Sequence, residues 1–186
     1  MNKFIKGVIS MPKIIENVRE LIIEEARKQI EENGYDNVTI RSIARGCKLG
    51  LGTFYNYFKS KDVLIATYLL KDWAGRLEII NDMSDKTDEP MQLVKVINEQ
   101  INGFMLENAT VFTAHGAIKA FQSSVGDYHK RLIEQISAPI YKVCHRGNYE
   151  NAEFLSQFVA EAILTWTVAK KTFEEFAPVM SKLFVK

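Results

Sequence analysis

The 186-residue sequence has only two cysteines and four prolines, and it has no long run of apolar residues. Cys47 and Cys144 lie far apart and form no CxxC motif, so we interpret both as small core residues of a reduced, cytoplasmic protein. No apolar stretch approaches the roughly twenty residues that span a bilayer, so no membrane helix is expected. The first ten residues make a poor signal peptide, and we expect them to form an arm or an upstream extension.

Charge of one sign is also lacking over the chain as a whole, since the formal net charge is only +1. The balance is nevertheless uneven. Residues 1–61 hold eleven Lys or Arg against seven Asp or Glu, whereas residues 62–186 hold thirteen against sixteen. Within residues 33–61 alone, five basic residues stand against one acidic residue. This asymmetry indicates that the N-terminal part of the chain binds a polyanion. The alternative is a chance clustering of surface charge.

Motifs of common enzyme classes are missing. None of His115, His129 and His145 follows a Glu by three residues, which excludes the usual spacing of a di-metal helical bundle. The sequence also has no HExxH, no GxSxG and no glycine-rich phosphate loop. We therefore expect no catalytic residue, no metal and no cofactor. An α-helical enzyme would need a catalytic cluster assembled from distant residues.

What the sequence does contain is a hydrophobic period close to 3.6 almost throughout, which predicts an all-α fold. We expect an N-terminal arm and helix-turn-helix domain over residues 1–60 and a helical ligand-binding and dimerisation domain over 61–186. A first helix should stop at Asn33-Gly34, and Ser60 should cap a long helix carrying Val63, Ala66, Leu70, Trp73, Leu77 and Ile80 on one apolar face. Further helices are predicted near 90–107, 109–123, 127–145 and 151–171, with a short last one entered at about Pro178.

The segment from Gly34 to Phe58 reads as turn, helix, turn, helix. Thr39 is a good N-cap for the first short helix, and Leu49 plugs the following turn. In the second helix, Phe54 and Phe58 are spaced by four residues and should point inward. The outward set is then Leu51, Gly52, Thr53, Tyr55, Asn56 and Tyr57. Such a helix can enter a DNA major groove, because its glycine end is narrow and its polar side chains can form hydrogen bonds with DNA. The alternative is that Tyr55 and Tyr57 pack into a small core.

These residues carry a resemblance to a known family. The matching elements are Gly34-Tyr35, Thr39-Ile40 with Ile43-Ala44, Gly52-Thr53, Tyr55-x-Tyr57-Phe58 and Lys59-Ser60-Lys61. The stretch from about Ala26 to Leu64 resembles the DNA-binding domain of the TetR family of bacterial transcriptional regulators. The resemblance implies phosphate contacts from Thr39, Tyr55, Tyr57 and Lys61, and a homodimeric repressor that binds double-stranded operator DNA and is released by a small-molecule effector. The full set of candidate DNA contacts is Thr39, Arg41, Lys48, Gly50, Leu51, Gly52, Thr53, Tyr55, Asn56, Tyr57, Lys59 and Lys61.

Three positions depart from the pattern of that family. Lys48 and Gly50 stand where the family often has a turn glycine and a Ser or Thr, and Leu51 replaces a residue that is often basic or polar. An apolar Leu51 can read only shape or a thymine methyl. The alternative function is a helical protein that binds a ligand or a protein partner and no longer reads DNA.

The rear of the chain supplies two further candidate sets. The candidate effector pocket comprises Trp73, Phe104, Met105, Phe112, His115, Phe121, Tyr128 and Trp166, although residues at helical spacing are more often core. The helix near 151–171 is apolar nearly all round, so one of its sides is expected to face a second subunit, with packing inside a monomer as the alternative. The candidate dimer interface comprises Phe154, Phe158, Ala162, Trp166, Phe173 and Met180.

Overall fold

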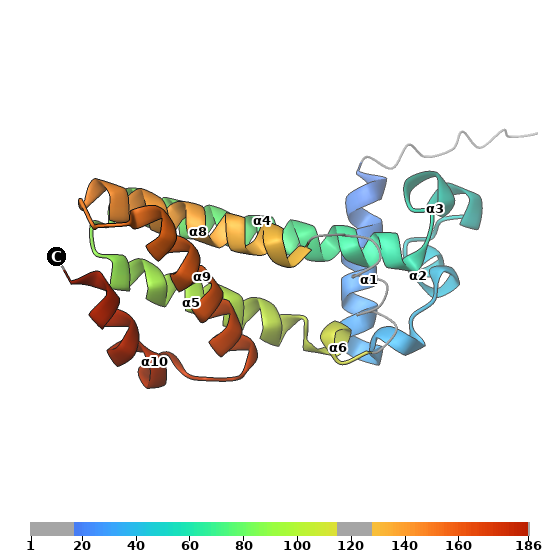
Figure 1. Ribbon diagram of the computed structural model, residues 1–186. Helices are drawn as coiled ribbons and strands as arrows, with labels where there is room; N and C mark the ends of the chain where they lie inside the picture. The colour runs from blue at the N-terminus through green and yellow to red at the C-terminus, as the bar shows by residue number, and fades with distance from the viewer. Residues whose placement is uncertain (1–16, 115–127, 186) are drawn as a thin grey trace, which may run out of the picture.

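The computed structural model describes residues 17–114 and 128–185, and every regular element in these ranges is helical. The predicted all-α class, with a small helix-turn-helix unit ahead of a larger helical body, is confirmed (Figure 1). The elements are, in chain order, α1 (Val18–Asn33), η1 (Tyr35–Asn37), α2 (Ile40–Gly46), α3 (Leu51–Tyr57), α4 (Lys61–Lys86), α5 (Pro90–Glu107), α6 (Ala109–Phe112), α8 (Tyr128–Arg146), α9 (Ala152–Val168), α10 (Phe173–Met180) and η2 (Ser181–Phe184).

The N-terminal unit packs α1, α2 and α3 around a small apolar core. Helix α1 ends where the sequence predicts, because Gly34 takes a positive φ of 77° and its amide donates to the carbonyl of Ile30 at 2.8 Å. Thr39 caps α2 as expected. Its hydroxyl accepts from the amide of Ser42 at 3.1 Å, and the hydroxyl of Ser42 accepts from the amide of Thr39 at 3.0 Å. These two caps define where α2 begins relative to α1.

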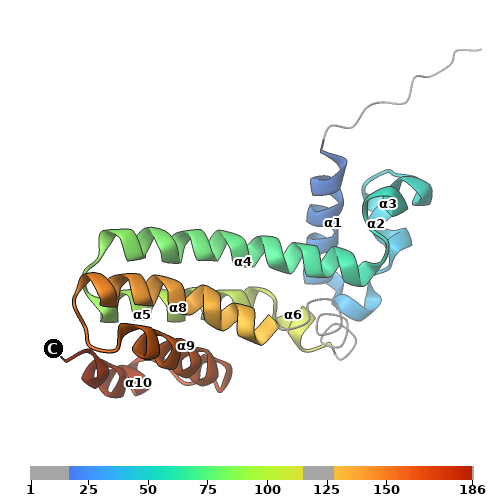
Figure 2. The same cartoon turned by 45° about the horizontal axis from the view of Figure 1, so that its top comes forward.

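Helix α4 is the longest element, with 26 residues, and it connects the two parts of the molecule. The hydroxyl of Ser60 accepts from the amide of Val63 at 3.2 Å, which confirms the predicted cap. In both views α4 runs from the helix-turn-helix unit to the far end of the body (Figures 1 and 2). The predicted apolar face is wrong at Val63 and Leu70, which are exposed, because α4 packs against α1, α5 and α8 with a different set of side chains. The largest buried ones are Leu64, Ile65, Tyr68, Leu69, Trp73 and Ile80.

The body consists of α4, α5, α8, α9 and α10. Helix α5 is the central helix of the body, since it contacts α4, α8, α9 and α10. Helices α8 and α9 form a closely packed pair. Cys144 on α8 and Val159 and Ile163 on α9 are fully buried. One polar pair is also buried here. The side-chain amide of Asn98 on α5 donates to the hydroxyl of Thr167 on α9 at 2.8 Å.

Two predicted boundaries are wrong. The last helix begins at Phe173, not at about Pro178, because Thr172 and Glu175 form a reciprocal capping box one turn earlier. The helix predicted over 109–123 ends at Phe112, where the hydroxyl of Thr113 donates to the carbonyl of Ala109 at 2.8 Å. The remainder of that prediction falls largely on residues 115–127, outside the described ranges.

Candidate nucleic-acid interface

Helix α3 is anchored by two phenylalanines that point into the N-terminal core. Phe54 and Phe58 are both essentially inaccessible to solvent, with their ring centroids 6.2 Å apart. This confirms the inward face predicted from their spacing of four residues. Burying two aromatic side chains fixes the rotation of a helix only seven residues long, and a helix this short needs such packing to be stable.

The opposite face of α3 is open to solvent. Tyr55 is 51% exposed, and Leu51, Gly52, Thr53, Asn56 and Tyr57 are exposed as well. Tyr55 makes an edge contact with Phe54 through its ring, at 5.8 Å between centroids, and its side chain nevertheless remains half accessible. Since neither tyrosine lies in the core, packing does not account for their presence on this helix.

The glycines at the leading end of α3 have no internal neighbours. A Cβ added to Gly50 or Gly52 would meet no atom within 4 Å, and neither residue has a positive φ. Folding therefore does not require glycine at either position. Their absent side chains instead leave the first turn of α3 slim on the solvent side, so that another surface can approach the backbone closely.

The turn between α2 and α3 is tight and carries a non-glycine residue in a left-handed conformation. Lys48 has φ of 57°, and its amide donates to the carbonyl of Arg45 at 3.0 Å. Leu49 closes the turn as predicted, since it is half-buried and its amide donates to Ala44 at 2.8 Å. A left-handed lysine costs about 1–2 kcal/mol relative to ordinary backbone, where glycine would cost little.

Positive charge surrounds this face without neutralisation. Arg41, Arg45, Lys48 and Lys59 are all exposed, and within the described residues none of them lies within 4.0 Å of a carboxylate. Thr39 is exposed at the start of α2, with its oxygen engaged as the cap. The arrangement provides cations that attract a polyanion and hydroxyls that donate to its oxygen atoms.

Lys61, which is predicted to contact phosphate, also makes contacts within the chain. Its ammonium group donates to the carbonyls of Tyr35 and Val38 at 2.9 and 3.0 Å, and it lies 3.9 Å from the centroid of the Tyr35 ring. Burial lowers the pKa of Lys61, and nearby Asp36 and Asp62 partly offset that effect. The ammonium therefore holds η1 against the start of α4, a function that depends on tertiary contacts and carries no signal in the local sequence.

A neighbouring contact strengthens the same junction. The hydroxyl of Tyr35 donates to the carboxylate of Asp62 at 2.7 Å. Burial, followed by this hydrogen bond, raises the pKa of Tyr35 well above its ordinary value. Tyr35 and Lys61 together connect the helix-turn-helix unit to α4, although the sequence suggested a turn residue and a DNA contact.

The predicted effector residues do not line one pocket. Trp73 and Phe104 are buried in the core and pack against each other at 5.5 Å, and Trp166 packs against Phe176 at 5.2 Å. Met105 and Phe112 do line a hollow of about 700 Å³. Tyr128 is half-buried at the start of α8, and His115 and Phe121 lie outside the described residues.

The predicted interface residues divide in the same way. Phe154 and Phe158 are exposed on α9 and stack at 6.4 Å. Ala162, Trp166 and Phe173 are only partly exposed. Met180 is fully buried, so it cannot contact a second subunit; α10 turns this residue toward the body of its own chain.

The described residues offer few features of a metal site, a reactive thiol or a membrane helix. Among these residues, no group of three His, Cys, Asp or Glu side chains is close enough to hold a metal ion. Burial raises the pKa of both thiols, Cys47 and Cys144, to about 11, which leaves them protonated and unreactive at neutral pH. None of the helices in residues 17–114 and 128–185 is long and apolar enough to cross a bilayer.

Comparison with known proteins identifies the N-terminal unit. Residues 22–68 match the family model described as bacterial regulatory proteins, tetR family. The chain is 41% identical over 61 residues to the HTH-type transcriptional regulator HbdR of Aromatoleum sp. (strain CIB), covering 33% of this chain and 27% of that protein. It is 29% identical over 97 residues to the HTH-type transcriptional regulator SAB2452 of Staphylococcus aureus, covering 52% of each. The matches thus span about a quarter to a half of these relatives' own lengths.

Solved structures extend the likeness to the helical body. A transcriptional regulator from Cytophaga hutchinsonii superposes with a TM-score of 0.63 at 18% identity, covering 88% of this chain and 93% of that one. A TetR-family regulator from Syntrophomonas wolfei gives a TM-score of 0.58 at 21% identity, covering 89% and 92%. At these identities the likeness concerns the fold. The tetR family model thus accounts for residues 22–68, and the helical body shares the fold of these solved regulators.

Proposed function

We propose that this protein is a DNA-binding transcriptional regulator in the cytoplasm, acting as a homodimer that a small-molecule effector releases from its operator. The observation that carries the proposal is the two-faced α3, with Phe54 and Phe58 buried and Tyr55, Asn56 and Tyr57 exposed beside slim glycine backbone. A recognition helix of this kind enters the major groove and presents its outer face to base edges and phosphates.

Each part of the outer face has a distinct task in this proposal. Tyr55, Tyr57 and Thr39 donate hydroxyl hydrogens to phosphate oxygens, which fixes the position of α3 without adding charge. Arg41, Lys48 and Lys59 release counterions from the backbone and supply the affinity that depends on salt. Leu51 meets apolar groups such as the thymine methyl, so fewer direct hydrogen bonds to bases are made.

The homodimer is supported by apolar side chains left uncovered on α8 and α9. Phe154 stacks on Phe158, and Tyr141 stacks on His145 at 5.4 Å, with all four side chains exposed. Exposed aromatic pairs of this kind mark protein interfaces. Pairing two copies through this surface would present two α3 helices to one face of a duplex, about 34–36 Å apart or somewhat further.

The test is selection of bound DNA from a random pool by the purified protein, followed by gel shifts at several salt concentrations. We expect a two-fold symmetric site, and an affinity that falls steeply with salt in proportion to the phosphates contacted. Tyr55→Phe, which removes a donor without changing the fold, should weaken binding to all sequences. Recovery of no enriched site, together with unchanged affinity in Tyr55→Phe, would overturn the assignment.

A further inference from the structure

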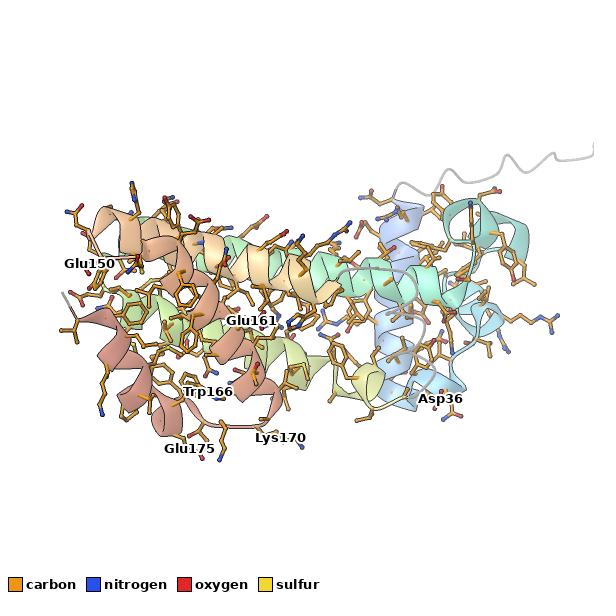
Figure 3. All side chains as sticks on the ribbon, in the orientation of Figure 1. Asp36, Glu150, Glu161, Trp166, Lys170 and Glu175 are labelled. Carbon is orange, nitrogen blue, oxygen red and sulfur yellow. The ribbon has the colours of Figure 1, made fainter. Side chains whose placement is uncertain are left out.

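The body contains a hollow of about 700 Å³ that the sequence did not predict as a unit. It lies where the end of α5 and α6 face the end of α9 and the loop into α10. Its size is within the range of sites that enclose small organic molecules. In Figure 3, the labelled Lys170 stands on that loop just beyond α9, with Trp166 one turn earlier.

The hollow is lined by uncovered apolar side chains and by charged ones, the latter including Glu99 and Glu174 beside Lys95 and Lys171. Leu106 on α5 is 78% exposed and Val168 on α9 is 55% exposed, and both line the hollow together with Met105, Phe112 and Phe173. Large aliphatic side chains that line an open hollow leave their apolar surface in contact with water, which is unfavourable. An apolar molecule in the hollow would recover it at roughly 25 cal/mol per Å² of surface removed from water.

A chain of two amides, the exposed Asn102 and the buried Asn98, ends at one side of the hollow. The amide of Asn102 donates to the side-chain oxygen of Asn98 at 3.1 Å, and the amide of Asn98 donates to the hydroxyl oxygen of Thr167 at 2.8 Å. Thr167 is almost fully buried yet lines the hollow, and no described residue accepts its hydroxyl hydrogen. The direction of donation therefore leaves Thr167 as a donor for an oxygen inside the hollow.

A free cation stands next to that donor. Among the described residues Lys170 has no carboxylate within 4.0 Å, whereas Lys171 pairs with Glu175 at 3.0 Å. Lys170 follows the end of α9, and its amide bonds the carbonyl of Thr167 at 2.9 Å. It takes a left-handed φ of 59°, where glycine would be less strained. The hydroxyl and the ammonium thus belong to one rigid turn.

We propose that this hollow binds an elongated apolar molecule with a single carboxylate head. The apolar body lies between Leu106 and Val168. The carboxylate accepts the hydroxyl hydrogen of Thr167 and lies within the field of the Lys170 ammonium. The inference rests on the proposed function in one respect, since it identifies the hollow as the effector site of the regulator.

The hollow is also connected to the N-terminal unit through one short segment. Leu106 and Phe112 in its wall flank Glu107 and Asn108 in the sequence. Asn108 donates to the carboxylate of Asp72 on α4 at 2.9 Å, and Glu107 pairs with Arg76 on α4 at 2.8 Å. A molecule that moves Leu106 or Phe112 therefore moves the partners that position α4, which is the coupling an effector requires.

The first experiment measures binding to the purified protein without DNA, by calorimetry and thermal shift. The probes are decanoate, decan-1-ol and decylamine, which share one chain and differ in the charge of the head group. We expect decanoate to bind about tenfold more tightly than the alcohol, because it adds a charge-assisted hydrogen bond, and the amine to bind most weakly. Equal binding of all three would overturn the carboxylate head, and binding of none would overturn the hollow as the site.

Substitutions then test whether binding occurs in this hollow. Lys170→Gln should weaken decanoate up to about fivefold, the usual range for an exposed ion pair, whereas Lys182→Gln on η2 should change nothing. Thr167→Val should weaken it about tenfold, and Thr167→Ser, which keeps the hydroxyl, should restore binding. Val168→Trp should fill the hollow and abolish binding, with the equally exposed Val179→Trp as its matched control. Equal effects in the site variants and their controls would place the ligand elsewhere.

A gel shift with the selected operator separates this inference from the proposed function. Release of DNA by decanoate in the wild type, and loss of that release in Val168→Trp, would support both. A protein that binds operator DNA but no decanoate would overturn the ligand site and leave the regulator standing. A protein that binds decanoate but no DNA would do the reverse.

Discussion

The guanidinium of Arg76 on α4 lies 2.8 Å from the carboxylate of Glu107 at the end of α5. The same carboxylate lies 3.8 Å from Arg27 on α1, so one side chain of the body holds cations from both the long helix and the N-terminal unit. The Arg76 side chain is only 12% exposed, and its Nε has no hydrogen-bond partner although Asp72 stands 3.5 Å away. This group of charges joins α5, α4 and α1 at one junction.

Removing the charge of Glu107 should therefore weaken the junction. Glu107→Gln leaves the buried guanidinium of Arg76 with a poorer partner, and we expect the free energy of unfolding to fall by about 1–2 kcal/mol, less than for a fully buried pair because Glu107 is half exposed. Urea denaturation measures the change. Glu134→Gln, which removes an exposed partner of Lys130 at 4.0 Å, is the control and should cost no more than about 0.5 kcal/mol. Equal losses of stability in Glu107→Gln and Glu134→Gln would show that the Glu107 pair contributes no more than a surface ion pair.

Gly52→Ala should separate stability from DNA binding. Alanine is the better helix former by about 0.8–1 kcal/mol, and the added methyl meets no atom of the protein within 4 Å, so stability should rise. The same methyl projects from the slim end of α3, so affinity for operator DNA should fall. Thermal melts and gel shifts measure the two effects. Gly75→Ala in α4, which is equally unobstructed, should stabilise without changing DNA affinity. Undiminished DNA binding by Gly52→Ala would argue against close approach at α3.

Lys59 and Lys61 should behave oppositely although only one residue separates them. Lys61→Met loses two hydrogen bonds from the ammonium and should cost about 2 kcal/mol of stability. Lys59→Met removes an exposed charge and should leave stability unchanged, while reducing the slope of log affinity against log salt by about one unit. Denaturation and salt-dependent gel shifts measure the pair. Unchanged stability in Lys61→Met would contradict the role of this ammonium in holding η1 against α4.

The dimer should depend on the exposed phenylalanines of α9. The double substitution Phe154→Glu and Phe158→Glu places charges on an apolar surface without disturbing the core, so light scattering should report a folded monomer in place of a dimer. The control replaces Val179 and Val185 by Glu, since both are exposed apolar side chains elsewhere. Trp166→Glu is unsuitable because Trp166 packs against Phe176 within the chain. A dimer that survives the double substitution would place the interface on another surface.

Stability should decline at alkaline pH through the two buried thiols. Burial raises the pKa of Cys47 and Cys144 from 9.0 to about 11. A raised folded-state pKa means that the native state holds its proton more strongly, so this contribution is complete below pH 9 and is lost as the pH rises toward 11. Urea denaturation across this range measures the slope. Replacing both cysteines by alanine should lower the overall stability and flatten the decline; an identical slope would assign it to other groups.

The sequence predicted features that depend on neighbours within one or two turns. Gly34 ends α1, Thr39 starts α2, and the spacing of Phe54 and Phe58 sets the inner face of α3, because capping and helical periodicity are local. The capping box at Thr172 is equally local. It overruled the expectation that Pro178 would open the last helix.

Features that depend on distant parts of the chain could not be predicted. Lys61 bonds carbonyls more than twenty residues earlier, so its sequence context showed only a basic residue after a recognition helix. Met180 has the spacing of an interface residue and is instead fully buried by its own chain. The hollow beside Thr167 joins residues from α5 and α9, whose relative placement arises only from tertiary packing.

The length of α4 determines how far a small tilt at one end of the helix displaces the other end. At 1.5 Å per residue its 26 residues form a lever of about 39 Å. A tilt of about 5° at the end near Asp85 displaces the other end by about 3 Å, close to the rise of one base pair in B-DNA. In a dimer, opposite tilts of the two α4 helices would move the two α3 helices out of register with the major groove, and no helix would need to unfold.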